Sequence, residues 1–350
     1  MRATRNLSVD IMRIIAAFSI VALHCVPLNE VVGIAIHGIA RFAVPLFFAI
    51  TGFYSEAVSV ERARNKLYQT LMIIVVATLI YLIRDIAIQI RQTGDVYSYI
   101  QTLLNVKTLS KIVFLGQNPV AGHLWYLNAI AFIYILLILE ATINSHKYIR
   151  PSFFYNLGAA GLVVLLACDL FAKGAEMHVN NALYRNALFM GLPMFLMGYL
   201  IRQNYNDEIE RNRHSLEGNE QPIANRRHLL NYLIVAILGM PLTLLQEFGL
   251  GTSELPLGSI VTAFGLLSFS TRCKNPRSQP NILRRLPMSD ISLTIYVTHL
   301  LVIFVLLNNV GAISRYGDRS WILTIAVIVI SAVIGIVYGY SKRIFRRLLL

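Results

Sequence analysis

Residues 321–341 read WILTIAVIVISAVIGIVYGYS, a run of 21 residues without Asp, Glu, Lys or Arg. An α-helix rises about 1.5 Å per residue, so about 20 apolar residues are needed to cross the roughly 30 Å of hydrocarbon in a bilayer. This stretch is long enough and apolar enough to cross on its own. It therefore predicts a transmembrane helix.

Nine further stretches have a similar length and composition. The chain of 350 residues is 56% hydrophobic and only 14% charged, with a mean hydropathy of +0.60. Soluble domains carry about 25% charged residues, so these values exclude an ordinary soluble domain and a disordered nucleic-acid-binding tail. We predict an all-α, polytopic integral membrane protein with about ten transmembrane helices. The predicted spans are 11–28, 40–58, 67–90, 124–143, 153–171, 187–201, 229–246, 255–270, 289–309 and 321–341.

Basic residues lie mainly in alternate segments between these spans. The formal net charge is +13, and 21 of the 31 Lys and Arg residues fall on the side of the N-terminus, against 8 on the other side. Cytoplasmic loops of membrane proteins are enriched in Lys and Arg, so both termini are predicted to be cytoplasmic. We expect a single transmembrane domain over residues 1–350, with residues 202–228 as a polar cytoplasmic loop.

The first span contains three ionisable residues, Asp10, Arg13 and His24. Arg13 and His24 are eleven residues apart, which returns to within roughly 20° of one helix face and places His24 about 16 Å further along the axis. Asp10, three residues before Arg13, can pair with it. Ionisable residues inside a span are costly, so three on one stripe indicate a functional site. Alternatively, Asp10 and Arg13 mark the inner interface and His24 packs against another helix.

The ninth span carries a second polar stripe. Ser292, Tyr296 and His299 are spaced by four and three residues, so they share one helical face. Hydroxyl groups often bond between membrane helices, which is the alternative explanation for Ser292 and Tyr296. His299 lies about ten residues inside the span and is harder to explain in that way.

Two other polar motifs lie at the ends of spans. His123 and Trp125 open the fourth span, where an aromatic belt at the outer interface is the alternative interpretation. Arg62, Arg64 and Lys66 follow the second span on the cytoplasmic side. These charges suit the phosphates of a cytoplasmic coenzyme, or alternatively set topology and attract lipid headgroups.

Five motifs, taken in order, resemble the bacterial membrane O-acyltransferase family, acyltransferase family 3, which O-acetylates surface sugars. They are LSVDIMR (7–13) with His24 following, RFAVPLFF (41–48) through Gly52, HLWY (123–126), PMFLMG (193–198) and SLTIYVTH (292–299). The compact length resembles members that act on enterobacterial common antigen or similar surface polysaccharides. The resemblance implies a ten-helix inner-membrane enzyme, acetyl-CoA as cytoplasmic donor, and His24 as the principal catalytic residue, supported by Arg13.

We therefore predict an O-acetyltransferase that moves an acetyl group from acetyl-CoA to a hydroxyl of an envelope glycan. Such transfer needs a base for the alcohol proton, and a neutral histidine can serve near neutral pH. We expect no metal and no nucleic acid partner. The predicted catalytic residues are His24, Arg13 and Asp10; the predicted donor-binding residues are Arg62, Arg64 and Lys66; the predicted substrate-binding residues are Arg41, His123, Trp125, Tyr296 and His299.

Two other functions remain open at this stage. Ten spans with buried charges are also typical of a transporter, or of a flippase for a lipid-linked sugar or small metabolite. Inverted repeats would favour transport, and we find none in the sequence. A non-catalytic membrane scaffold or sensor would tolerate replacement of its buried histidines.

Overall fold

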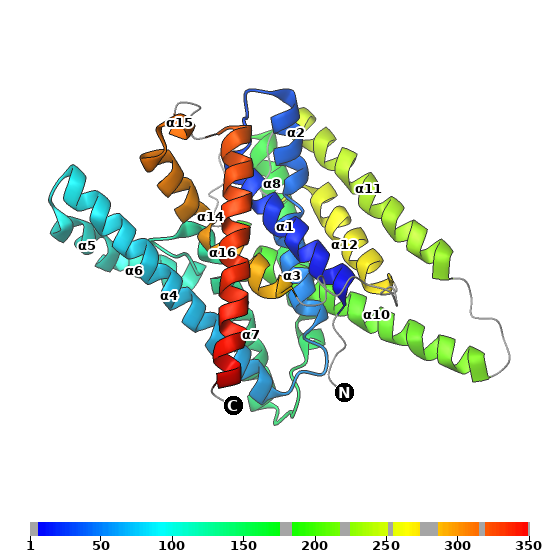
Figure 1. The fold of residues 1–350 in the computed structure, drawn as a ribbon. Coiled ribbons are helices and arrows are strands. Elements are labelled where there is room, and N and C mark those ends of the chain that lie inside the picture. The colour runs from blue at the N-terminus through cyan, green and yellow to red at the C-terminus, as the bar shows by residue number, and fades with distance from the viewer. Residues whose placement is uncertain are drawn as a thin grey trace. The chain divides into compact units, whose positions relative to one another are not determined.

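The computed structural model describes residues 6–175, 184–217, 225–250, 255–273, 286–314 and 319–348. Helices make up nearly all of these residues, and no strand occurs among them. The predicted all-α fold is therefore confirmed. The helices are α1 (Leu7–Cys25), α2 (Val31–Ala40), α3 (Ala43–Phe53), α4 (Val60–Gln92), α5 (Val96–Leu104), α6 (Val106–Leu115), α7 (Trp125–Ile143), α8 (Tyr155–Gly174), α10 (Leu192–Glu217), α11 (Asn225–Leu250), α12 (Leu257–Arg272), α14 (Met288–Asn309), α15 (Gly311–Ser314) and α16 (Trp321–Leu348), with the short turns η1 (Gly122–Leu124), η2 (Pro151–Phe154) and η3 (Ala187–Gly191) (Figure 1).

Eight segments of the described chain are long and apolar enough to cross a membrane, and each overlaps a predicted span. A multi-pass helical membrane protein is therefore the fold that the structure supports. The eight segments are Leu7–Cys25, Val31–Phe53, Val60–Gln92, Gly122–Ile143, Pro151–Ala172, His228–Gly249, Met288–Asn309 and Trp321–Ile344.

The two remaining predicted spans, 187–201 and 255–270, do not form helices of this kind. Helix α12 has 16 residues, which is about 24 Å and short of the hydrocarbon thickness. Residues 187–201 begin in the π-helical turn η3 and continue into α10, where Arg202 follows after ten residues. Eight of the ten predicted spans are thus confirmed, and a count of ten stays a prediction.

The second candidate span is Val31–Phe53, earlier than the predicted 40–58, and it bends between α2 and α3. Pro45 has no N–H and cannot donate to the carbonyl of Arg41, four residues before it, so the helix breaks there. At the same place, the Arg41 N–H donates to the carbonyl of Gly38, three residues before it, which makes a tighter turn than an α-helix. Arg41 therefore lies at the middle of this span and not at its start.

Residues 202–228, predicted as a loop, are largely helical. Residues 202–217 continue α10, and residues 225–228 begin α11. Residues 218–224 lie outside the described part of the chain. The polar composition predicted a solvated loop, but Glu, Arg and Gln are good helix formers, so a polar segment can extend an apolar helix. Its cytoplasmic location stays a prediction.

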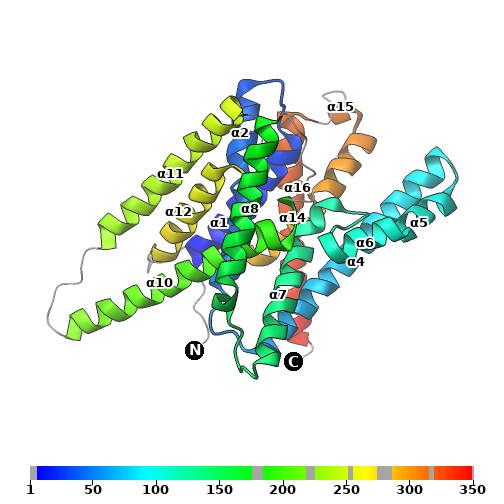
Figure 2. The same cartoon turned by 180° about the vertical axis from the view of Figure 1, so that it is seen from behind.

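The chain divides into two compact units. The single transmembrane domain over residues 1–350 stays a prediction. Unit 1 comprises Met1–Ile50 and Ile201–Leu350, and unit 2 comprises Thr51–Leu200. In unit 1, α1 contacts α2, α12, α14 and α16. Figures 1 and 2 show α1 between the α11–α12 pair and the α14–α16 pair. The first span is therefore the central helix of unit 1.

Asn6 anchors the start of α1. Its Oδ1 accepts hydrogen bonds from the N–H groups of Ser8 and Val9, which caps the helix, and its Nδ2 donates to the carbonyls of Ser270 and Thr271 at the end of α12. One side chain thus forms hydrogen bonds with backbone groups at the ends of two helices, where such groups have no partner within the helix.

Small residues bring α11 and α12 together in unit 1. A Cβ placed on Gly265 of α12 would lie 2.5 Å from the backbone nitrogen of Ala236 of α11. Such close backbone approach is typical of membrane helix pairs with small residues at their interface. This close packing against α11 holds α12 in place, although α12 has only 16 residues and has Pro256 and Gly258 near its start.

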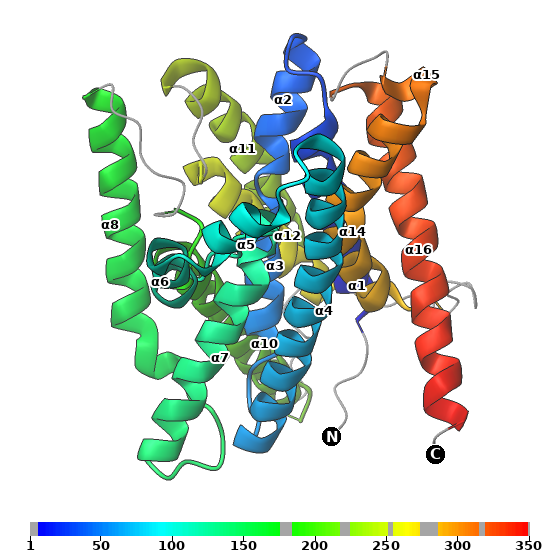
Figure 3. The same ribbon diagram turned by 90° about the vertical axis from the view of Figure 1, so that its left-hand side faces the viewer.

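In unit 2, α7 contacts both α4 and the turn η3, which in turn contacts α8. The loop after α4 leads into the short helices α5 and α6, which contact one another (Figure 3). The apolar residues of α5 and α6 recur at helical spacing.

Candidate active site

His24 of α1 and His299 of α14 lie together in unit 1. Their ring centroids are 5.1 Å apart, with planes tilted by 38°. His24 is partly buried, and the side chain of His299 is fully buried. The two residues are 275 positions apart in the sequence. Two independently predicted polar stripes therefore meet at one point.

The ring of His299 is held by its own helix. Its Nδ1 lies 2.8 Å from the carbonyl oxygen of Tyr296 and 3.1 Å from that of Ile295. Carbonyl oxygens only accept hydrogen bonds, so Nδ1 carries the hydrogen. In a neutral ring, Nε2 then has the lone pair and is the nitrogen that can accept.

The predicted stripe on α14 is a buried face. Tyr296 and Ser292 are 5% and 3% exposed, and the Tyr296 ring lies 6.4 Å from that of His299. Ser292 donates to the carbonyl of Ser289, which satisfies its hydroxyl locally. Tyr296 therefore lies next to the histidine pair, whereas the hydroxyl of Ser292 bonds within its own helix.

The histidine pair lies deeper than the position of His24 in α1 suggests. His24 is the penultimate residue of α1, but His299 lies near the middle of the 22-residue α14. Ten residues of α14, 300–309, follow His299, and they correspond to about 15 Å of helix. Measured along α14, the pair is thus well inside the apolar layer.

Asp10 and Arg13 lie at the opposite end of α1. The predicted pair forms, with Arg13 Nη1 3.4 Å from Asp10 Oδ1. Asp10 is buried, and the Arg13 side chain is 22% exposed. Eleven helical residues, about 16 Å, separate Arg13 from His24. The structure therefore brings His24 together with His299 and Tyr296, and leaves Asp10 and Arg13 about three turns away.

Arg41 pairs with a residue that the sequence analysis did not single out. Its Nε lies 2.9 Å from Oε1 of Glu247 on α11, and the two side chains are 11% and 2% exposed. Gly38 permits this approach, because a Cβ there would lie 3.2 Å from Cγ of Glu247. A signal was present in the sequence: Glu247 is an acidic residue directly after an apolar span. Arg41 thus has a structural partner as well as a predicted substrate role.

His123 lies in unit 2, in the turn η1 before α7. It is 9% exposed, and its ring stacks edge-to-face on Tyr81 of α4 at 4.9 Å. Trp125 begins α7 and is also 9% exposed. Tyr81, which is 1% exposed, links this turn to the middle of α4.

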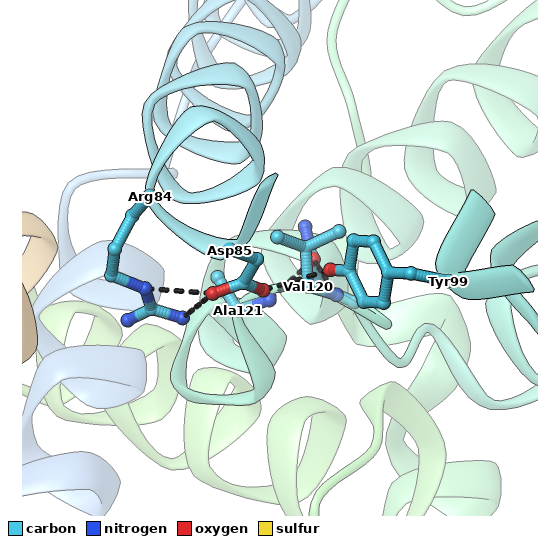
Figure 4. Close-up of polar contacts among 6 residues, drawn as sticks. Arg84, Asp85, Tyr99, Val120 and Ala121 are labelled. Carbon is cyan, nitrogen blue, oxygen red and sulfur yellow. Dashed lines mark hydrogen bonds and ion pairs between the residues drawn. The ribbon is translucent and has the colours of Figure 1, made fainter. Parts of the chain in front are cut away.

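Arg84 and Asp85 follow Tyr81 on α4, and Figure 4 shows them with Tyr99 of α5. The guanidinium of Arg84 lies 4.7 Å over the Tyr81 ring and bonds Oδ1 of Asp85 at 2.6 and 2.8 Å. The hydroxyl of Tyr99 on α5 donates to Oδ2 of Asp85 at 2.8 Å. Burial, followed by this hydrogen bond, raises the pKa of Tyr99 to about 12. Asp85 thus fastens α5 to α4.

The loop before His123 is also attached to α4. Oδ1 of Asn118 accepts from the N–H groups of Val120 and Ala121, and its Nδ2 donates to Thr78 Oγ1 at 2.6 Å. The turn that carries His123 therefore has a fixed position relative to α4.

The predicted donor-binding cluster divides into two parts. Arg62 and Arg64 are exposed on the first turns of α4 in unit 2. Lys66 is partly buried, donates to the carbonyl of Tyr54 at 3.3 Å, and lies 5.7 Å from the ring centroid of Tyr134. The two arginines are therefore accessible to an anion, whereas Lys66 also holds the chain between α3 and α4.

Apolar helices that bury a pair of facing histidines define an integral membrane protein with a candidate acid–base site. The sequence matches the acyltransferase domain of acyltransferase family 3 over residues 6–341, so the chain belongs to that family. The predicted family and the predicted enzyme class, an acyltransferase, are confirmed, and the transporter alternative is not favoured.

One characterised relative is a serine/alanine racemase of Enterococcus gallinarum, 32% identical over 223 residues. The alignment covers 57% of this chain and 29% of the racemase. The chain thus corresponds to less than a third of that protein's length. No solved structure matches this chain.

Proposed function

We propose that this acyltransferase is an O-acetyltransferase of the bacterial inner membrane, with both termini in the cytoplasm. It would transfer the acetyl group of cytoplasmic acetyl-CoA to a hydroxyl of an envelope or surface glycan, such as enterobacterial common antigen. The observation that carries the proposal is the contact between His24 and His299 inside the apolar layer of unit 1. A partly buried histidine in an acyltransferase suits a general base.

In the proposed reaction, the acceptor hydroxyl oxygen attacks the carbonyl carbon of the acetyl thioester. A C–O bond forms and the C–S bond breaks. The hydroxyl proton passes to His24 and then to the departing thiolate of coenzyme A. General-base assistance of this kind contributes typically about 10²–10⁴ in rate.

The donor is assigned to the charges at the start of α4. Arg62 and Arg64 are exposed and can form charge-assisted hydrogen bonds with phosphate oxygens. The N-terminal end of α4 adds a favourable dipole for an anion. At the start of α1, Asp10 and Arg13 are proposed to act on the donor side, because about 16 Å of helix separates them from His24.

The acceptor is assigned to His123 and Trp125 of unit 2. His123 and Trp125 form part of a turn that is anchored to α4 through Tyr81 and Asn118. Aromatic side chains with nearby hydrogen-bonding groups are suited to a sugar ring, which has apolar faces and polar edges. Arg41 is retained as a proposed substrate contact.

The test replaces His24 by Ala. Purified protein in vesicles is given radiolabelled acetyl-CoA and a glycan acceptor, and the acetylated product is measured. The variant should lose about 10²–10⁴ in rate while it still binds acetyl-CoA. His228→Ala is the matched control, because His228 is exposed at the start of α11. Wild-type transfer by the His24 variant would remove this residue from the chemistry, and unchanged glycan O-acetylation in a deletion strain would contradict the proposed acceptor.

A further inference from the structure

His299 is built as a fixed acceptor and not as a mobile ligand-binding side chain. Its ring is fully buried, and Nδ1 is bonded to carbonyls of its own helix, three and four residues earlier. These bonds restrict rotation of the ring and determine which nitrogen carries the hydrogen. The remaining nitrogen, Nε2, is an acceptor in the neutral ring.

Apolar residues of α1 and α14 pack together near this ring. Ala17, Val21 and Cys25 of α1 pack in one cluster with Ile295 and Val302 of α14. These contacts bring α1 against α14 on both sides of the level of His299. The centroids of the His24 and His299 rings are 5.1 Å apart, which is close enough for a hydrogen bond between nitrogens of the two rings.

We propose that His299 is a positioning residue for His24, in place of the predicted substrate contact. Nε2 of His299 would accept the N–H of His24, so that the other nitrogen of His24 presents its lone pair to the acceptor hydroxyl. The inference rests on the proposed function, in which His24 is the base. It follows the general arrangement in which a third group orients the base, with an imidazole where soluble enzymes often use a carboxylate.

An imidazole acceptor suits the apolar layer better than a carboxylate does. A carboxylate would place a charge beside His24 that needs a counter-charge or water, and charges inside a membrane are costly. A neutral imidazole fixes the tautomer of its neighbour without that cost. During transfer the proton of the hydroxyl goes to His24, and the N–H shared with His299 stays on His24. The proton count of His299 is unchanged throughout.

Three substitutions of His299 distinguish this role from simple packing. His299→Gln can place an amide oxygen near the position of Nε2 and keep an acceptor for His24. His299→Asn reaches only as far as Nδ1 and cannot, and His299→Leu removes the acceptor altogether. Thr298→Ala is the matched control, because the hydroxyl of Thr298 donates to the carbonyl of Thr294 on its own helix.

The assay measures acetyl transfer, with kcat and KM for both substrates determined separately. We expect His299→Asn and His299→Leu to lower kcat about 10²-fold or more, with KM values for both substrates near those of the wild type. His299→Gln should stay within about tenfold of the wild type. Protein abundance and thermal stability in detergent show which variants fold. If His299→Leu does not fold, the two amides decide the question between them.

Several results would overturn the proposal. Full activity of His299→Leu, equal loss in the Gln and Asn variants, or a rise in acceptor KM at unchanged kcat would each exclude positioning. The last result would restore the substrate-binding role. Full activity of His24→Ala would instead contradict the proposed base, so failure of the inference and failure of the proposed function give different results.

Discussion

The loss of either partner of the ion pair between Arg41 and Glu247 is predicted to destabilise unit 1 strongly. Removing one partner of a buried pair costs about 3–5 kcal/mol, because the other charge remains in the interior. The Arg41 side chain is 11% exposed and that of Glu247 is 2% exposed, at an N···O distance of 2.9 Å. We expect Glu247→Leu to lower the free energy of unfolding by about 3 kcal/mol, the lower end of this range, because the Arg41 side chain is not fully buried.

A double variant separates the ion pair from the burial of each side chain. Replacing both charges by apolar residues of similar size is often neutral for stability. The variant with Arg41→Met and Glu247→Leu should therefore be more stable than either single variant. Unfolding of the purified proteins in mixed micelles, titrated with SDS and followed by circular dichroism, gives the three free energies and their coupling.

Activity of the same variants tests the second role of Arg41. A folded double variant with wild-type kinetics would show that Arg41 acts only through Glu247. A folded double variant with a raised KM for the acceptor would support the predicted substrate contact. If Glu247→Leu is as stable as the wild type, or if the effects of the two single changes simply add, the stabilising role of the pair is refuted.

Three further predictions concern the donor site, the topology and the polar cluster on α4. Replacing Arg62 and Arg64 by Gln should weaken acetyl-CoA binding in a salt-dependent way without lowering protein abundance; unchanged affinity in equilibrium binding would assign both arginines to topology. A reporter fused after Ser215 should report the cytoplasm if ten segments cross the membrane and the opposite side if only the eight longest do, while a reporter at the C-terminus reports the cytoplasm in both cases. The raised pKa of Tyr99 means that its bond to Asp85 stabilises the fold fully below about pH 10, where an unfolded tyrosine begins to ionise, and that this contribution is lost as the pH rises toward 12. Unfolding free energies measured across that range should fall more steeply for the wild type than for Tyr99→Phe, and parallel curves would contradict the assignment.

Features that depend on neighbouring residues were predictable from the sequence. The Asp10–Arg13 pair follows from a spacing of three residues on a helix, and it forms. The common face of Ser292, Tyr296 and His299 follows from helical periodicity, and it is buried. Eight spans were found because hydropathy over about 20 residues is a local property.

Features that depend on helix packing were not predictable in the same way. The partner of Arg41 is 206 residues away in the sequence, and no local pattern links the two. The bend at Arg41 depends on Pro45, which cannot donate a backbone hydrogen bond. Hydropathy, from which the second span was predicted, does not register this missing hydrogen bond. Polar composition predicted a solvated loop at residues 202–228, but it did not reveal that most of them continue two helices.

The sequence alone determined that this protein is an all-helical membrane acyltransferase and that His24 and His299 are exceptional residues within apolar spans. Those conclusions rest on composition, spacing and family motifs, each of which is written along the chain. Only the tertiary structure decided that the two histidines meet, because their contact depends on how α1 packs against α14. It also decided which nitrogen of His299 carries the hydrogen, since that follows from carbonyl oxygens within hydrogen-bonding distance. Helix packing brings side chains that are 275 residues apart into contact, and the pattern of residues along the chain does not show which helices pack together.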